Sequence, residues 1–235
     1  MLRLNKLFLL TFTAGLLLQC NERQDLSFEP STEDLQKAAF QDVPEEGLPY
    51  FDKQNWDMLW ETNDETISKR RQVPKFSLVD QTGRPFNDQV LKKGLSLAGF
   101  FFTACDGYCP RIMKNLQRVQ EQAPGLRIYM HSVTPKLDTV ENLAEFAESL
   151  DADPEKWHLL TGSQELIYRL GREVYDADTK TKTAPTNDTF VHSESLYLVD
   201  PNLYIRGVYR GNSPADINRL LRELPQLEKE FGINS

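Results

Sequence analysis

An unbroken apolar run, LSLAGFFFTA at 95–104, leads directly into a pair of cysteines. A run of this kind, without the polar gaps of an amphipathic helix, is expected of a central strand that is buried on both faces. Cys105 and Cys109 follow, and Pro110 with the apolar spacing of PRIMKNLQRVQEQA predicts a helix that starts at Cys109. The sequence therefore predicts a buried strand, a short cysteine-bearing turn and a helix in direct succession.

Strand and helix patterns continue along the rest of the chain. The segment 73–86 predicts a β-hairpin around turn residues 80–83. Strands and helices then alternate, followed by a second hairpin and a last helix, at 126–133, 139–150, 157–162, 163–174, 195–209 and 213–224. This order predicts an α/β fold of the thioredoxin-like kind, with an N-terminal hairpin and a mixed central β-sheet flanked by helices. Residues 176–188 lack large apolar side chains and predict an exposed loop.

Residues 1–19 have the features of a lipoprotein-type signal peptide. Two basic residues precede the apolar segment LFLLTFTAGLLL, which is short for a membrane span. The sequence LLQC resembles a bacterial lipobox, in which Cys20 is lipidated and becomes the first mature residue, although Gln19 stands where a small residue is usual. Cleavage elsewhere and an uncleaved anchor stay open. Each alternative places the domain in the bacterial cell envelope, facing the periplasm or the outer side.

The segments that follow the signal peptide differ in composition. Residues 20–47 are polar and acidic, which predicts a flexible tether. Residues 48–72 contain the aromatic-rich stretch LPYFDKQNWDMLW and are expected to pack on the domain as a lead-in arm. Residues 73–228 form the expected thioredoxin-like domain, which is long enough for a hydrophobic core of its own.

The formal net charge of -8 at pH 7 argues against a nucleic-acid partner. Proteins that bind nucleic acid usually carry a basic face, and Lys and Arg cluster in this chain only at 69–71. We therefore expect an acidic surface and no nucleic acid among the partners.

The chain has three cysteines, of which Cys20 belongs to the lipobox. Cys105 and Cys109 are thus a single pair in a compartment where thiols tend to oxidise. The helix N-terminus is expected to lower both thiol pKa values and to favour the thiolates that bind metal or attack disulfides. The three residues between the cysteines allow the sulfurs to share a metal and also allow a disulfide. A disulfide that only staples so short a loop would stabilise the fold little.

Soft thiolates favour Cu(I), and an imidazole could complete the ligand set. Among the three histidines, His192 is the expected ligand, because it lies between the exposed loop and a strand, where its side chain can lean over a helix start. His131 and His158 lie inside predicted strands and are expected to be structural. Acidic residues are expected at solvated turn or cap positions without a catalytic role, namely Asp106, Asp138, Glu194 and Asp200.

Five stretches in a common order resemble the Sco family (SenC/PrrC-type proteins) over roughly 48–224. They are LPYF, FSLVDQTGRPF, FFTACDGYCP, SVTPKLDTVENLAEFA with WHLLTGSQELI, and VHSESLYLVDP. The resemblance implies a thioredoxin-fold copper chaperone for cytochrome c oxidase assembly. It places the family's copper ligands on Cys105, Cys109 and His192, with the metal bound as Cu(I), Cu(II) or both.

The chain departs from the family pattern near the cysteines. Asp106 and Gly107 stand where the family commonly has Pro and Asp, and Thr134 stands where it has Asp. These differences are expected to alter copper affinity or redox potential. Asp138 matches the family's DT element, and its role stays open between support of the ligands and an N-cap before Thr139.

Two functions follow from this reading. The first is a copper-binding metallochaperone that passes copper to an oxidase subunit in the membrane. The second is a membrane-tethered thiol-disulfide oxidoreductase, in which Cys105 and Cys109 are a redox-active dithiol that reduces the target's cysteines. His192 discriminates between the two, because only the first needs it. A peroxiredoxin-like enzyme is disfavoured, since no peroxidase-type surrounding is found around Cys105.

Overall fold

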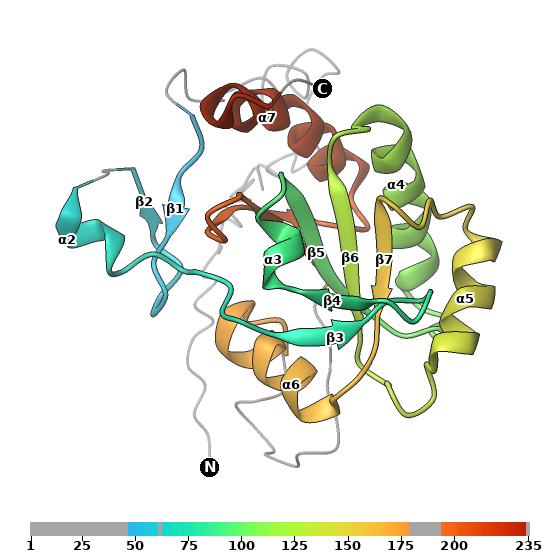
Figure 1. Ribbon diagram of the computed structural model, residues 1–235. Coiled ribbons are helices and arrows are strands. Elements are labelled where there is room, and N and C mark those ends of the chain that lie inside the picture. The colour runs from blue at the N-terminus through green and yellow to red at the C-terminus, as the bar shows by residue number, and fades with distance from the viewer. Residues whose placement is uncertain (1–46, 61–62, 179–193, 234–235) are drawn as a thin grey trace, which may run out of the picture. The chain divides into compact units, whose positions relative to one another are not determined.

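The structure, a computed structural model, describes residues 47–60, 63–178 and 194–233. Its centre is a five-stranded sheet in the order β7-β6-β5-β8-β9 (Figure 1). β5, β6 and β7 are parallel, β8 is antiparallel to β5, and β9 is antiparallel to β8. The strands are β5 (Ser96–Phe101), β6 (Arg127–Ser132), β7 (Trp157–Leu160), β8 (Ser195–Val199) and β9 (Ile205–Arg210). The predicted mixed sheet is confirmed.

β5 lies at the middle of the sheet, and every one of its residues is buried, as the apolar run predicts. Because side chains alternate along a strand, Leu97 and Phe101 enter one hydrophobic cluster while Ala98 and Phe100 enter the other. Gly99 allows the neighbouring strands to approach closely. A Cβ at this position would lie 2.7 Å from Met130 Cε and 2.9 Å from Leu196 Cδ2.

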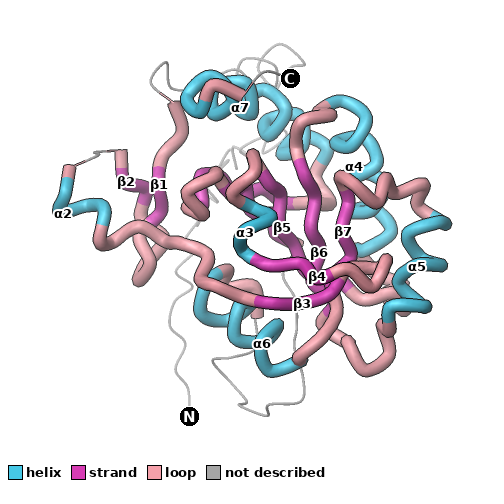
Figure 2. Tube along the Cα trace, viewed as in Figure 1, coloured by secondary structure: helices cyan, strands magenta, loops and turns pink. Residues whose placement is uncertain are grey.

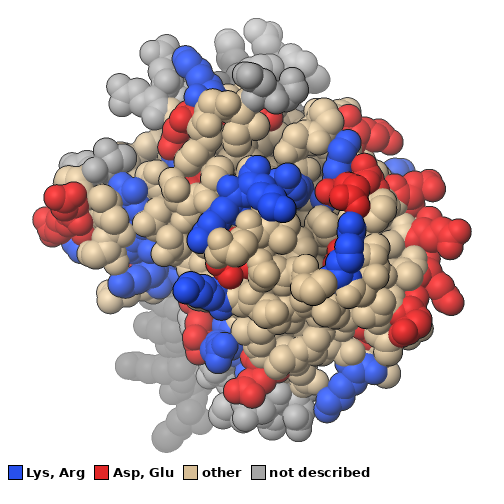
Figure 3. Space-filling model, in the orientation of Figure 1, with Lys and Arg blue, Asp and Glu red and all other residues tan. Residues whose placement is uncertain are grey.

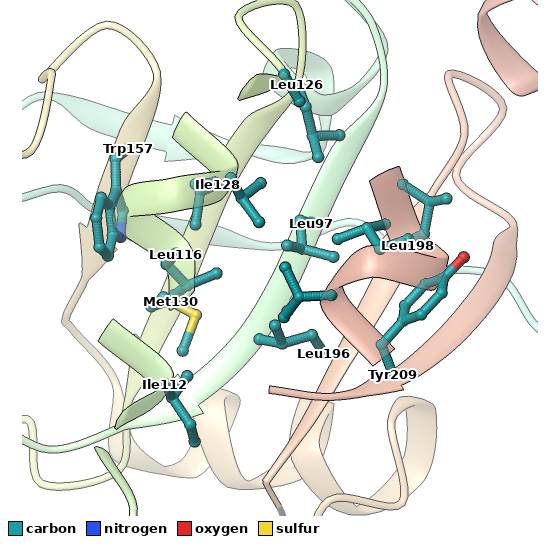
Figure 4. Close-up of a cluster of buried hydrophobic side chains, with 14 of the residues drawn as sticks. Leu97, Ile112, Leu116, Leu126, Ile128, Met130, Trp157, Leu196, Leu198 and Tyr209 are labelled. Carbon is teal, nitrogen blue, oxygen red and sulfur yellow. The ribbon is translucent and has the colours of Figure 1, made fainter. Parts of the chain in front are cut away.

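Three helices cover the face toward which Leu97 points. They are α4 (Cys109–Gln122), α5 (Val140–Ser149) and α7 (Pro214–Phe231). Ile112 and Leu116 of α4 pack against sheet residues such as Leu97 and Met130 (Figure 4). α7 continues beyond the predicted end at residue 224 and passes through Pro225. The burial of one such Leu side chain contributes about 1.5–3 kcal/mol, so α4, which carries Cys109, is held firmly on the sheet.

The opposite face is covered by α3 (Asp88–Leu91), α6 (Gln164–Arg169) and the hairpin of β3 (Ser77–Val79) and β4 (Pro85–Asn87). The predicted hairpin is confirmed. The predicted helix at 163–174 is α-helical only to Arg169, because the chain continues as a π-helical turn, η1 (Leu170–Val174). Ala177 and Asp178, expected to lie in an exposed loop, are buried, and the rest of that predicted loop lies outside the described residues. Asp178 pairs there with Arg172 at 2.8 Å.

The lead-in arm contacts the rest of the domain, because the Arg71 guanidinium donates to the Val174 carbonyl at 2.9 Å. The arm contains the short strands β1 (Tyr50–Phe51) and β2 (Met58–Leu59) and the helix α2 (Asp64–Ile67) (Figure 2). The Arg70 guanidinium lies 3.7 Å from the centre of the Tyr50 ring, and the Arg71 guanidinium lies 3.9 Å from that of Trp56. Two cations of the basic cluster at 69–71 are therefore engaged in packing within the chain.

Several predictions fall outside the described residues: the signal peptide, the lipidation site Cys20, nearly all of the tether, and His192. Among the helices that are described, none combines the length and the apolar character that crossing a membrane requires.

Candidate metal and thiol site

The two cysteines lie where the polypeptide passes from the central strand to a helix. β5 ends at Phe101, and α4 begins at Cys109, as predicted. Tyr108 is the N-cap residue but supplies no side-chain hydrogen bond, and Pro110 occupies the first turn. The carboxyl end of β5 thus presents Cys105 on the turn and Cys109 at the start of the helix.

The two thiols differ in exposure. Cys105 is partly exposed, whereas Cys109 is 2% exposed and belongs to the hydrophobic cluster beneath α4. The two sulfurs are thiols and are not joined as a disulfide, and they share a hydrogen bond. The pair therefore has one sulfur that solvent, metal or another thiol can reach and one sulfur that can act only after the first.

Burial raises the pKa of the Cys109 thiol well above its ordinary value, and the hydrogen bond and the charge of Cys105 act in the same direction. Backbone N–H groups of Phe102 and Cys109 lower the pKa, but by less. The expectation that the helix N-terminus lowers both thiol pKa values is therefore wrong for Cys109. The helix start does favour the thiolate, but desolvation in the core outweighs it.

A buried carboxylate supports the cysteine-bearing turn. Asp138 is 1% exposed, and its Oδ2 accepts hydrogen bonds from Ser132 Oγ at 2.5 Å and Thr134 Oγ1 at 2.9 Å. Its Oδ1 accepts one from Thr103 Oγ1 at 2.5 Å. The helix N-cap is Thr139 itself, whose side chain accepts from the Asn142 N–H. Asp138 is thus neither solvated nor a cap, and the N-cap alternative is wrong.

A pattern in the sequence points to this network. Hydroxyl residues follow both β5 and β6 at their carboxyl ends, which are adjacent because the strands are parallel. Thr134, one of the departures from the family pattern, belongs to the network. The other two, Asp106 and Gly107, are exposed, and a side chain at Gly107 would meet no described atom within 4 Å. Asp200, also expected to be solvated, is fully buried beside Arg206.

The described histidines lie away from the thiols. His131 is fully buried, stacks on Phe100, and is held by a 3.1 Å hydrogen bond between Nδ1 and the Gly99 carbonyl. Burial lowers its pKa to about 4, so the ring is neutral. The prediction that His131 is structural is confirmed. His158 lies at the amino end of β7, and its Nδ1 contacts Asp80 Oδ2 at 3.2 Å. His192 lies outside the described residues.

The donor set suits a soft metal ion or thiol chemistry. Two adjacent sulfurs favour Cu(I) over hard cations. No group of three or more His, Cys, Asp or Glu side chains that could hold a metal ion occurs within 47–60, 63–178 and 194–233. The described part of the site is therefore a dithiol, of which Cys105 is the partly exposed member.

Comparisons with known proteins agree with this geometry. A family model described as SCO1/SenC matches residues 64–226. The SCO1 protein homolog of Bacillus subtilis (strain 168) is 30% identical over 152 residues, which cover 62% of this chain and 78% of that protein. The crystal structure of a SCO1/SenC family lipoprotein from Bacillus anthracis str. Ames is similar with a TM-score of 0.60 and 30% identity, over 66% of this chain and 94% of that one. Arabidopsis thaliana ScoI, crystallised with copper bound, gives a TM-score of 0.53 and 26% identity, over 65% and 98% of the two chains.

Proposed function

Because the chain belongs to the SCO1/SenC family, we propose that it is a copper-binding metallochaperone. Copper is held by Cys105, Cys109 and His192 and is delivered to a membrane cuproprotein, for which we propose the copper centre of cytochrome c oxidase. The observation that carries this proposal is the pair of thiols, not joined as a disulfide, that follows the carboxyl end of β5. Arabidopsis thaliana ScoI, a structural relative, has been crystallised with copper.

The unequal burial of the thiols gives the pair an order of action. Cys105 is partly exposed and is the first sulfur that incoming copper can reach. Cys109 keeps its proton until the metal arrives, because burial disfavours its thiolate. Cu(I) replaces that proton, and the metal's charge offsets the cost of a buried thiolate. Copper binding is therefore coupled to proton release.

Two exposed apolar side chains, one next to Cys109 and one next to Asp138, suit a protein recipient. Five large hydrophobic side chains of the described residues are exposed, and three of them belong to the lead-in arm. The other two are Tyr108, 58% exposed and adjacent to Cys109, and Leu137, 66% exposed and adjacent to Asp138. The hydrogen bond from Thr103 to Asp138 links the two segments. We propose that Tyr108 and Leu137 contact the copper-receiving subunit.

The proposed location is the bacterial cell envelope, with the domain tethered to the membrane through a lipid on Cys20. The Bacillus anthracis relative is described as a lipoprotein, which supports this proposal. Metabolic labelling with a radioactive fatty acid tests it. Label is expected in the wild-type chain and not in Cys20→Ser, and equal labelling of the two chains would contradict the anchor.

Anaerobic titration of the reduced chain with Cu(I) tests the chaperone function. The wild-type chain is expected to bind one copper, and Cys105→Ser with Cys109→Ser is expected to bind none at this site. His192→Ala is expected to bind more weakly and to release copper faster, whereas the matched control His158→Gln keeps wild-type affinity. A wild-type chain that binds no copper, or a His192→Ala chain that binds and releases it unchanged, would contradict the proposal.

A second candidate is a thiol-disulfide oxidoreductase, which the hydrogen bond between the two thiols favours. In that reaction the Cys105 thiolate attacks a disulfide of the target and forms a mixed disulfide. Cys109 then displaces the target's second thiol, so that the target gains two electrons and the pair becomes a disulfide. This activity needs both cysteines but not His192. Undiminished reductase activity of His192→Ala, together with unchanged copper binding, would favour it.

A further inference from the structure

A small cavity with positively charged walls lies at the opposite end of the sheet from the cysteines. Lys93 precedes β5, Arg127 begins β6 and His158 is the second residue of β7. These strands are parallel, so the three residues meet at the amino ends of the strands, whereas Cys105 lies beyond the carboxyl end of β5. All three line a cavity of about 250 Å³. A water molecule occupies about 30 Å³ in the liquid, so the cavity can hold a tetrahedral oxyanion with bound water.

His158 is fixed so that one ring nitrogen is left for a ligand. The side chain is 7% exposed, and its ring lies 4.8 Å from that of Phe86 between centroids. Nδ1 lies 3.2 Å from Asp80 Oδ2, so it donates to the carboxylate. Asp80 is held in turn, because its Oδ1 accepts from Thr82 N, Thr82 Oγ1 and Arg84 N. Nε2 has no hydrogen-bond partner in the described parts of the chain.

Two positively charged side chains in the cavity wall are available to bind a ligand. Neither Lys93 nor Arg127 forms a side-chain hydrogen bond or an ion pair with any residue the structure describes. Arg84, in contrast, donates to Glu155 Oε1 at 2.7 Å and to the Pro154 carbonyl at 2.8 Å. The charged residues that line the cavity thus have a net positive charge, although the net charge of the whole chain is -8. Lys and Arg side chains gather over α3 and the adjoining strand ends in Figure 3.

We propose that His158 Nε2, Arg127 and Lys93 bind a phosphate-type oxyanion, either free phosphate or the phosphodiester of a lipid headgroup. Guanidinium, ammonium and imidazolium groups all donate charge-assisted hydrogen bonds to phosphate oxygens. A cation does not fit the cavity. The available side chains in the cavity wall, Lys93 and Arg127, are positively charged, and both Asp80 carboxylate oxygens already accept hydrogen bonds. The proposal is independent of the copper function.

Binding of the anion is coupled to a proton on His158. Burial lowers the pKa of His158, the charges of Arg84 and Arg127 lower it further, and Asp80 raises it. The other charged groups at the cavity are Lys93 and Glu155. An anion beside Nε2 adds negative charge and accepts its proton, so it stabilises the imidazolium. The occupied site therefore has a higher His158 pKa and binds more tightly as pH falls.

Imidazole NMR of the full chain labelled with ¹⁵N-histidine tests the proposal. One arm titrates inorganic phosphate and the other titrates dihexanoylphosphatidylglycerol below its micelle concentration, each against sodium chloride of equal ionic strength. We expect the His158 signals to shift and saturate in at least one arm, with a raised pKa. The arm that saturates at the lower concentration identifies free phosphate or the lipid headgroup as the source.

Lys93→Gln with Arg127→Gln is expected to weaken binding about tenfold or more, because each contact is a charge-assisted hydrogen bond. The matched control is Lys114→Gln, which removes an exposed charge from α4 on the other face of the sheet. No saturable shift in either arm would overturn the proposal. So would an equal shift with chloride, or equal weakening by the control, since both indicate unspecific charge screening.

Discussion

The Thr103 hydroxyl donates a hydrogen bond to the Asp138 carboxylate, with 2.5 Å between the two oxygens. Thr103 lies two residues before Cys105, and Asp138 follows β6, so the bond attaches the cysteine-bearing turn to the neighbouring strand. Ser132 and Thr134 donate to the same carboxylate. One buried charge therefore organises three hydroxyl groups beneath the site.

Asp138→Ala is expected to lower the free energy of unfolding by about 3 kcal/mol or more. Each hydrogen bond to a buried charge contributes about 1.5–3 kcal/mol, and the substitution leaves three buried or half-buried hydroxyls without an acceptor. Urea denaturation of the reduced chain measures the loss. Asp106→Ala is the matched control, because Asp106 is exposed on the same loop, and its change is expected to stay within about 0.5 kcal/mol. Equal stability of the two variants would show that the network contributes nothing.

The stability of the reduced, metal-free chain is expected to fall as pH rises above about 9. The unfolded chain releases the Cys109 proton near the ordinary thiol pKa of 9.0, whereas the folded chain retains it, because its pKa is raised. The contribution of Cys109 is thus fully present below pH 9.0 and is lost as pH rises through the folded pKa, with a slope that approaches about 1.4 kcal/mol per pH unit.

Denaturation at several pH values between about 8 and 10 measures this slope, and Cys109→Ala is the control that lacks it. Above pH 10.0 the buried Tyr129 and Tyr175 add a second decline, since burial raises their pKa values too. An identical pH dependence of wild type and Cys109→Ala below pH 10 would contradict the assignment to Cys109.

Tyr108→Ser with Leu137→Ser is expected to slow copper transfer to the recipient about tenfold, with Cu(I) affinity and stability unchanged. Both side chains are exposed, so they contribute little to the fold, but truncation of an interface hot spot, a role in which Tyr is enriched, costs about 2 kcal/mol or more. Stopped-flow transfer to a copper-free recipient domain measures the rate. Met58→Ser removes a side chain that is 61% exposed in the lead-in arm and is expected to leave the rate unchanged. Equal rates for all three chains would exclude this docking surface.

Arg206→Met is expected to destabilise the chain by about 3–5 kcal/mol and to loosen the lead-in arm. The buried guanidinium donates to Asp200, to Glu230 of α7 and to the carbonyls of Leu48 and Pro49, so its loss leaves a buried Asp200 charge without its partner. Urea denaturation and limited proteolysis near residue 48 measure both effects.

The control for Arg206 is Arg210→Met on the same strand. Arg210 pairs with Asp216, but its side chain is 72% exposed, so its loss is expected to cost less than about 1 kcal/mol. Equal free energies of unfolding and equal proteolysis of the two variants would show that the buried ion pair does not stabilise the lead-in arm.

The local sequence pattern was enough to predict the strand and the helix that position the two cysteines. The apolar run at 95–104 identified the central strand because burial on both faces leaves no polar position in it. Pro110 and the apolar spacing after it placed the helix start at Cys109, where the structure has it. These features are encoded within a few residues, so the thioredoxin-like order of elements, with Cys105 and Cys109 between strand and helix, was readable from the chain alone.

Tertiary structure decided the properties that depend on neighbours distant in sequence. The helix start argued for an acidic Cys109 thiol, but packing under α4 removed its solvent and raised its pKa. Asp138 looked like a cap and became the acceptor for hydroxyls from two strands. Lys93, Arg127 and His158 share one cavity only because three parallel strands begin at the same edge. Periodicity shows which face of an element is buried, whereas charge state and hydrogen bonding depend on which distant groups the fold brings to that face.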